Sequence, residues 1–245
     1  MIVGLLMVSH EDDVLAATLQ KHAANVDVFY ALDGTYPNDW SRSLIESHPR
    51  CHGYWQDSRL PPEYGTQPRD GWRQWLLEHA YADHGHEHVF ALLHADEVWT
   101  RSPAEIADEH PEANGFIMRL PVYFPQIWIV GRDPLEQLKW HLIPGWPEFR
   151  MFRGGPDVRY DTRQHFNVTP QGIDRIVSVD APIRHYPYRS PETQRKRANH
   201  TEATGWDPDN YRHVLDHDEV LWTGKTVERW KRASPLNWRE AVRDP

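Results

Sequence analysis

Residues 89–99 read VFALLHADEVW, an apolar run that ends abruptly in His94, Asp96 and Glu97. Residues 89–93 predict a strand that is covered on both faces of its sheet, because they show no polar alternation. An α/β sheet presents the polar end of such a strand at its carboxyl edge, where ligands bind. Nitrogen and oxygen ligands there suit a divalent ion that bridges two phosphates of a nucleotide. The alternative is that Asp96 caps a following helix, with Glu97 in its first turn.

Two earlier apolar segments predict further strands of the same sheet. Residues 2–8, IVGLLMV, indicate a buried strand, and residues 26–32 indicate a second one that ends at Asp33. An acidic segment between them opens a helix, and acidic residues suit the positive end of a helix dipole. This β–α–β order implies a right-handed crossover and parallel strands.

The segment before the strand expected over 89–93 predicts helices. Residues 36–70 are polar and contain Pro, with a short helix expected over 40–47. Asp70 is the expected N-cap of a longer helix over 71–85, whose apolar residues recur near helical spacing. Residues 1–100 therefore predict half of a nucleotide-binding α/β domain.

The pattern changes in the second half of the chain. Strands are expected over 115–124, around 127–130 and over 176–188. Residues 132–165 are rich in Pro, Gly, Trp and Arg, and the chain past Arg197 is charged with weak periodicity. One large domain with a C-terminal extension is the simplest organisation of such a sequence.

Composition excludes several classes of protein. Of the 245 residues, 39% are hydrophobic and 26% are charged, which is typical of a folded domain and not of a disordered chain or a membrane protein. The N-terminal apolar run is too short for a bilayer and lacks signal-peptide features, so we expect a cytoplasmic protein without a membrane span. A single cysteine, Cys51, allows neither an intrachain disulfide nor a Cys-based zinc site. The net charge of −9 argues against an extensive phosphate-binding surface, although residues 184–197 form a basic strip.

Two other polar positions follow expected strands. Asp33 has the chemistry to accept hydrogen bonds from a uracil N–H or from ribose hydroxyls, but this position taken alone favours an Asp-Gly turn. His185 has the chemistry of a ligand for Mn²⁺-like ions, and Arg189 that of a phosphate partner. The alternative for His185 is a solvated histidine in a basic loop.

The order of these positions resembles a glycosyltransferase of the GT-A type, closest to the family 2-like enzymes of bacteria and phages. The segments that carry the resemblance are VGLLMVSHEDD, FYALDGT, GWRQWLLEHA, VFALLHADEVW, FRMFRGGPDVRYDTRQHFNVTPQG and IRHYPYRSPETQRKR. It implies a Rossmann-like, mostly parallel central sheet flanked by helices. It also implies a catalytic domain over 1–197, with a nucleotide-binding half (1–100) and an acceptor-side half (101–197), before an extension over 198–245.

The resemblance also implies roles for particular residues. Asp96 would be the main metal ligand, and His185 a second one. The residues that would contact the donor nucleotide are Asp33, Asp57, Arg73, Arg189, Arg195 and Arg197. Of these, Asp33 and Asp57 would contact the nucleoside, whereas the arginines would approach the phosphates.

Two departures from the family pattern affect the chemistry. His94 stands where relatives carry the first Asp of Asp-x-Asp, so it is either a third metal ligand or a contact to the sugar or ribose. His165 is followed by Phe166 where many relatives carry a His-Glu pair. The general base is then Asp161, Glu148, Asp157 or His165 itself.

The expected activity is transfer of a sugar from a nucleotide-diphosphate sugar, a UDP-sugar by preference, to an acceptor hydroxyl, with Mn²⁺ or Mg²⁺ and with inversion. The acceptor stays open among surface glycan, protein, small molecule and modified DNA base. One alternative is a nucleotidyltransferase, which would normally carry a Gly-rich basic loop where this chain has the acidic VSHEDD. The other is a non-catalytic nucleotide- or glycan-binding relic of the same fold.

Overall fold

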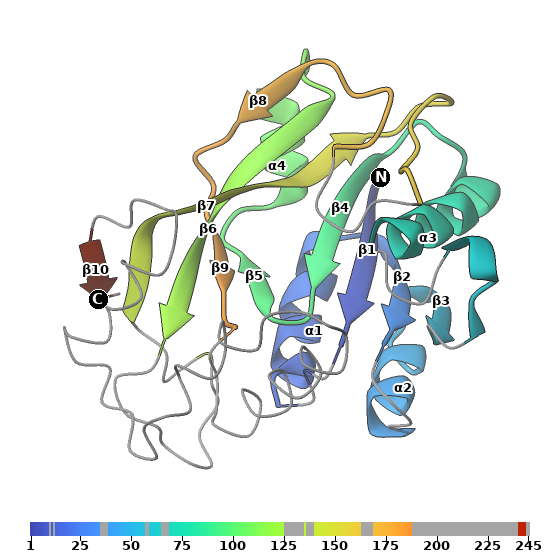
Figure 1. The fold of residues 1–245 in the computed structure, drawn as a ribbon, viewed down its shortest axis with the longest axis horizontal. Coiled ribbons are helices and arrows are strands. Elements are labelled where there is room, and N and C mark those ends of the chain that lie inside the picture. The colour runs from blue at the N-terminus through green and yellow to red at the C-terminus, as the bar shows by residue number, and fades with distance from the viewer. Residues whose placement is uncertain are drawn as a thin grey trace. The chain divides into compact units, whose positions relative to one another are not determined.

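The computed structural model describes residues 1–9, 11, 13–34, 39–56, 59–64, 69–124, 135, 140–162, 169–187 and 240–243. Within these residues the strands are β1 (Ile2–Val8), β2 (Val28–Asp33), β3 (Cys51–Gln56), β4 (Val89–His94), β5 (Glu97–Trp99), β6 (Gly115–Phe124), β7 (Trp140–Arg153), β8 (Ile176–Ser178), β9 (Ile183–His185) and β10 (Glu240–Arg243). The helices are α1 (Leu15–Asn25), α2 (Asp39–Glu46), α3 (Arg69–His84) and α4 (Pro103–Glu109), with a 3₁₀ turn, η2 (Pro62–Tyr64) (Figure 1).

The strands form a mostly parallel sheet, as the sequence predicted. Their order is β3-β2-β1-β4-β7-β6-β9-β5, with β8 beside β6 and β10 beside β7. Strand β1 pairs in parallel with β2 and β4, and β3 pairs in parallel with β2. Strand β7 runs antiparallel to β4 and β10. The α/β fold class is therefore confirmed.

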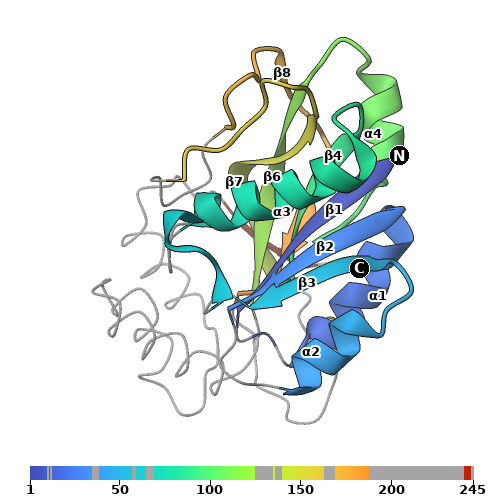
Figure 2. The ribbon, with the colours of Figure 1, turned by 90° about the vertical axis from the view of Figure 1, so that its right-hand side faces the viewer.

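Helices cover both faces of the sheet around β1. Figure 2 shows α1 and α2 on one face of β1–β3 and α3 on the other. Right-handed crossovers require this, because the chain moves from β1 outward through β2 to β3 and then returns to β4 on the far side of β1. Leu76, Leu77 and Ala80 of α3 belong to one buried apolar cluster with alternate residues of the strands, including Leu5 and Leu92. The period of two along β4 therefore places His94 on the α3 face, with Leu92.

The chain divides into two compact units. The first comprises residues 1–119 and 147–183, and the second comprises residues 120–146 and 184–245. In the second unit β10 pairs with β7, and the Tyr123 ring stacks on His141 at a centroid distance of 4.8 Å. The first unit contains the carboxyl ends of β1, β2 and β4.

Several local predictions were wrong. Helix α3 begins at Arg69, so Asp70 lies inside it and is not its N-cap. Strand β3 was missed because CHGYWQ is a half-buried strand at the end of the sheet and has no apolar run. Strand β7 was missed because Pro and Gly, which weaken a strand, lie within it. The segment 176–188 holds two short strands instead of one.

The alternative role for Asp96 as a helix cap is also wrong. Glu97 opens strand β5, and the next helix, α4, begins at Pro103. The cap of α4 is Ser102, whose Oγ accepts a hydrogen bond from the Ala104 N–H at 3.2 Å. Asp96 therefore lies in a turn between two strands.

The strand expected around 127–130 and nearly all of the segment 198–245 lie outside the described residues. None of the helices in the described part of the chain combines the length and the apolar character that a bilayer crossing requires.

Candidate metal centre

The candidate site lies where the strand order reverses. The chain runs from β1 to β2 on one side and places β4 on the other, so the carboxyl ends of these strands form a topological switch point, the usual ligand site of an open α/β sheet. Asp33 pairs with Val8 of β1, and His94 pairs with Met7. Because neighbouring strands lie about 4.8 Å apart, the Cα atoms of Asp33 and His94 lie about 10 Å apart across β1.

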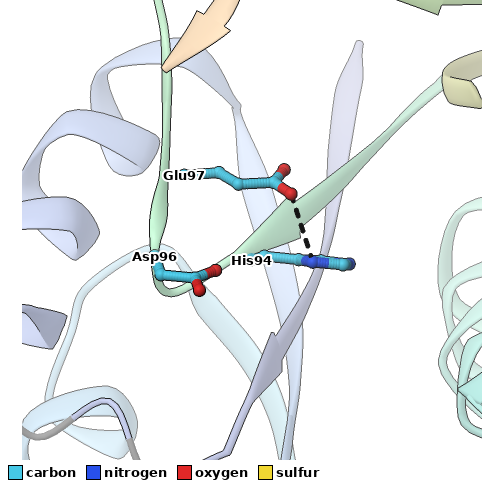
Figure 3. Close-up of side chains that lie close together, drawn as sticks. All are labelled: His94, Asp96 and Glu97. Atoms are coloured by element: carbon cyan, nitrogen blue, oxygen red, sulfur yellow. Dashed lines mark ion pairs between the residues drawn. The ribbon is translucent and has the colours of Figure 1, made fainter. Parts of the chain in front are cut away.

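His94, Asp96 and Glu97 form a cluster that could hold a metal ion. One candidate ligand atom from each residue lies within 4.8 Å of the others, and Figure 3 shows the two carboxylates and the imidazole on the same side of the β4–β5 turn. His94 Nδ1 lies 3.3 Å from Glu97 Oε1. All three residues are largely buried, Glu97 completely. One nitrogen and two carboxylates are donors that divalent metal ions accept.

A buried arginine holds Glu97 in place. Arg150 of β7 donates from Nε to Glu97 Oε2 at 3.0 Å and from Nη2 to Oε1 at 2.8 Å. Arg150 also pairs with Glu148. Burial opposes the charge of Arg150, but Glu97 and Glu148 outweigh it and raise the pKa of Arg150 above its ordinary value. The guanidinium is therefore charged, and its fork matches the Glu97 carboxylate.

Arg73 approaches the cluster from α3. Its side chain is fully buried, and its Nη2 lies 3.5 Å from His94 Nε2. Its guanidinium carbon lies 6.0 Å from the centre of the Tyr160 ring. The Tyr160 N–H donates to Gln74 Oε1 at 2.7 Å, which ties the segment around Asp161 to the same helix. The structure thus brings Arg73 to the end of β4, with the segment before Asp161 beside it.

Asp33 is buried at the end of β2. Its Oδ2 accepts hydrogen bonds from Ser41 Oγ at 2.7 Å and from the Tyr54 hydroxyl at 3.0 Å. Burial and the Asp33 charge raise the pKa of Tyr54, so the phenol keeps its proton and donates it to this bond. Asp33 therefore joins the end of β2 to α2 and β3.

His22 of α1 supports the site from the opposite face. Its Nε2 lies 2.8 Å from the carbonyl oxygen of His94, at the end of β4. Burial lowers the pKa of His22 to about 4, although the His94 carbonyl and the Asp96 charge partly oppose the shift. The ring is thus neutral near pH 7, and its Nε2–H donates to the His94 carbonyl.

The predicted site residues fall into three groups. Arg73, His94 and Asp96 meet at one place, with Asp33 two strands away. His185 belongs to the second unit. The predicted residues that lie outside the described part of the chain are Asp57, His165, Arg189, Arg195 and Arg197.

Three further residues of the site were not predicted in these roles, namely Glu97, His22 and Arg150. Glu97 was predicted as part of the polar end of this strand but was given no role of its own, and nothing in its local sequence marks His22. An arginine between Phe149 and Met151 in an apolar segment is a usable signal for Arg150, because a buried cation requires a buried acid.

No protein-family model and no curated protein matches the chain. Solved structures with similar folds include HddC from Yersinia pseudotuberculosis, with 9% identity and a TM-score of 0.41 over 80% of this chain and 97% of that one. A protein of Bacillus anthracis assigned as a glucose-1-phosphate thymidylyltransferase shows 8% identity and a TM-score of 0.39 over 75% and 89% of the two chains. A protein of Desulfovibrio desulfuricans assigned as a nucleotide-diphospho-sugar transferase shows 10% identity and a TM-score of 0.37 over 95% of each chain. Similarity at this level assigns neither a family nor an activity.

Proposed function

We propose that the chain is a metal-dependent glycosyltransferase that uses a nucleotide-diphosphate sugar, with a UDP-sugar as the favoured donor. One observation carries the proposal. Acidic and imidazole ligands and a buried arginine converge at the carboxyl end of β4, at the switch point of a parallel sheet. Packing alone does not require this arrangement, because burying charged groups costs free energy.

Different residues would contact different parts of the bound donor. Arg73 would donate to phosphate oxygens, and His94 and Asp96 would hold Mn²⁺ or Mg²⁺. The ion would stabilise the charge that develops on the departing diphosphate. By the family resemblance, Asp33, about two strand spacings away, would contact the nucleoside of such a donor.

Some assigned roles stay proposals from the family resemblance. These are the base contact of Asp57, the second metal ligand His185, and the closure of Arg189 and Arg195 over the diphosphate.

Of the four general-base candidates, Asp161 is the one that we favour. It follows Tyr160, whose ring lies over the Arg73 guanidinium. A carboxylate near that position would take the proton from the acceptor hydroxyl as the hydroxyl attacks the anomeric carbon. A single displacement of this kind inverts the anomeric centre.

Nucleotidyl transfer is the second candidate, and the turn after β1 argues against it. A nucleotidyltransferase would use backbone N–H groups in this turn to bind phosphate. Here the buried Glu11 carboxylate accepts the Ser9 N–H, so one donor of the turn already serves an internal acid.

The proposed function is tested by thermal unfolding with UDP and UDP-sugars, with and without Mn²⁺. A ligand at a hundred times its Kd stabilises the folded protein by about 2.7 kcal/mol. We expect this stabilisation only with metal, and its loss in Asp96→Ala. The matched control is Asp108→Ala, which removes an exposed carboxylate of α4 and should behave as the wild type. If no nucleotide stabilises the wild type under any condition, the transferase proposal fails and a non-catalytic binding module replaces it.

Product analysis separates the two transfer reactions. A glycosyltransferase releases UDP from a UDP-sugar. A nucleotidyltransferase joins a sugar phosphate to the nucleotidyl group of a nucleoside triphosphate and releases pyrophosphate. Metal-dependent formation of pyrophosphate, with no release of UDP, would establish the second candidate instead.

A further inference from the structure

The two ring nitrogens of His94 face groups of opposite character. Nδ1 lies 3.3 Å from a carboxylate oxygen of Glu97, and Nε2 lies 3.5 Å from the guanidinium of Arg73. An ionised carboxylate can only accept a hydrogen bond, and a guanidinium can only donate one. Both neighbours therefore favour the same neutral tautomer, with the proton on Nδ1 and the lone pair on Nε2.

Glu97 is fixed by contacts that do not involve a metal. Both of its oxygens accept hydrogen bonds from Arg150, at 2.8 and 3.0 Å, and both side chains are buried. Arg150 is itself anchored by the carbonyl of Phe149 at 3.2 Å and by Glu148. If Glu97 turned toward a metal, it would break two charge-assisted bonds and leave a buried cation with one partner fewer.

We infer that Glu97 is a positioning residue and not a metal ligand. Clamped by Arg150, it holds His94 as the Nδ1–H tautomer, which leaves Nε2 as the nitrogen that would ligate a metal once the Arg73 N–H donates to a phosphate instead. A carboxylate that orients a ligating imidazole in this way is a common outer-shell arrangement in metal sites. The metal part of the inference rests on the proposed function, whereas the tautomer of His94 does not.

The tautomer is measured by ¹⁵N NMR of the histidine side chains in the metal-free wild-type protein, above the ordinary pKa of imidazole. His94→Gln identifies the His94 signals by their loss. We expect a protonated Nδ1 and an unprotonated Nε2. A proton on Nε2, or an even mixture of the two tautomers, would overturn the inference. This measurement requires neither metal nor nucleotide, so its result is independent of whether the chain is a transferase.

The ligand set is tested with two variants that each remove one negative charge beside Arg150. Each variant is titrated with Mn²⁺, and electron paramagnetic resonance monitors the binding. Glu97→Gln should weaken Mn²⁺ binding by about 10- to 100-fold, the usual effect of losing an orienting carboxylate. Glu148→Gln removes the other carboxylate that pairs with Arg150, whereas Glu97 is the one that lies against His94, so this variant should leave the affinity within about threefold of wild type. Equal weakening in both variants would show that only the charge of Arg150 matters and would overturn the inference.

Addition of ¹¹³Cd²⁺ to the wild-type protein distinguishes the remaining cases without any variant of the network. Scalar coupling of cadmium to His94 Nε2 supports the inference, and coupling to Nδ1 overturns it. If the wild type binds neither Mn²⁺ nor Cd²⁺ while the Nδ1–H tautomer is present, the proposed metal-dependent function fails and Glu97 positions His94 for some other ligand.

Discussion

His22 is a buried imidazole on α1 whose ionisation opposes folding. Its Nε2 bonds the His94 carbonyl, and its Nδ1 is buried without a hydrogen-bond partner in the described part of the chain. Burial lowers the pKa of His22 from 6.5 to about 4. Between these pH values the unfolded chain binds the extra proton more tightly than the folded one. The stability that neutral His22 provides is therefore complete above pH 6.5 and is lost as the pH falls towards 4.

The expected loss is roughly 3 kcal/mol over that window, since one unit of pKa corresponds to about 1.4 kcal/mol. Urea unfolding at about pH 7.5 and about pH 5 measures the part of this loss that falls above pH 5, roughly 2 kcal/mol. His22→Gln keeps a donor for the His94 carbonyl and should reduce the difference in unfolding free energy between the two pH values. A substitution of the exposed His86 to Gln should not. An unchanged pH dependence in His22→Gln would contradict the assignment.

At the scale of single residues, the sequence predicted the ends of the strands and missed what lies behind them. Asp33, His94 and Asp96 are visible because a polar residue that follows an apolar run is conspicuous. Arg150 reaches Glu97 across 53 positions in the sequence, and no local pattern encodes such a contact. Arg73 was predicted to lie near the site because its helix, α3, directly precedes β4.

Helix α4 provides a test of the two interpretations of Asp96. Its N-cap is Ser102, so Ser102→Ala should lower the free energy of unfolding by about 1 kcal/mol. The same variant should leave Mn²⁺-dependent nucleotide binding unchanged, whereas Asp96→Ala should abolish it. Chemical denaturation and the thermal-shift titration measure the two effects. A loss of nucleotide binding in Ser102→Ala would show that the site depends on the position of α4.

Strand β1 is closely packed at Gly4. A Cβ there would lie 2.7 Å from Leu93 Cδ1 and 3.0 Å from Phe29 Cβ. Gly4→Ala should therefore cost about 1–3 kcal/mol of stability through overpacking. Gly155 is the matched control, because the nearest atom to its Cβ would be Val158 Cγ2 at 3.7 Å. Equal stability of the two variants in urea would show that the Leu93 side chain moves away from the added methyl group without cost.

At the scale of elements, buried parallel strands were predictable and the strands beyond them were not. β1, β2 and β4 are continuous apolar runs, since helices cover both of their faces. β3 is half-buried at the end of the sheet order, and its residues carry no period that distinguishes them from a loop. β7 contains Pro144, Gly145 and Pro147, which normally interrupt a strand, and its pairing partners β4 and β10 lie far away in sequence.

At the scale of the molecule, the unit that carries the site is built from two separated segments. Residues 147–183 add Phe149, Phe152 and Tyr160 to the core cluster of residues 1–119, and they supply Arg150 to Glu97. A fragment of residues 1–119 should therefore fail to unfold cooperatively, whereas a fragment of residues 1–183 should do so. Circular dichroism during heating measures both. A cooperative transition in the shorter fragment would show that the N-terminal segment folds by itself.

Arg73 gives the site a property that neither the metal nor the donor would have alone. Its positive charge lies 3.5 Å from the nitrogen that would ligate the ion, so an arriving divalent cation meets a like charge. An arriving diphosphate attracts the same guanidinium and relieves that repulsion. The two ligands are then thermodynamically coupled, and each raises the affinity for the other by the same factor. Either ligand can bind first, and the equilibrium is the same. Without the diphosphate, the Arg73 guanidinium would weaken binding of the divalent ion, and binding of the diphosphate would strengthen it.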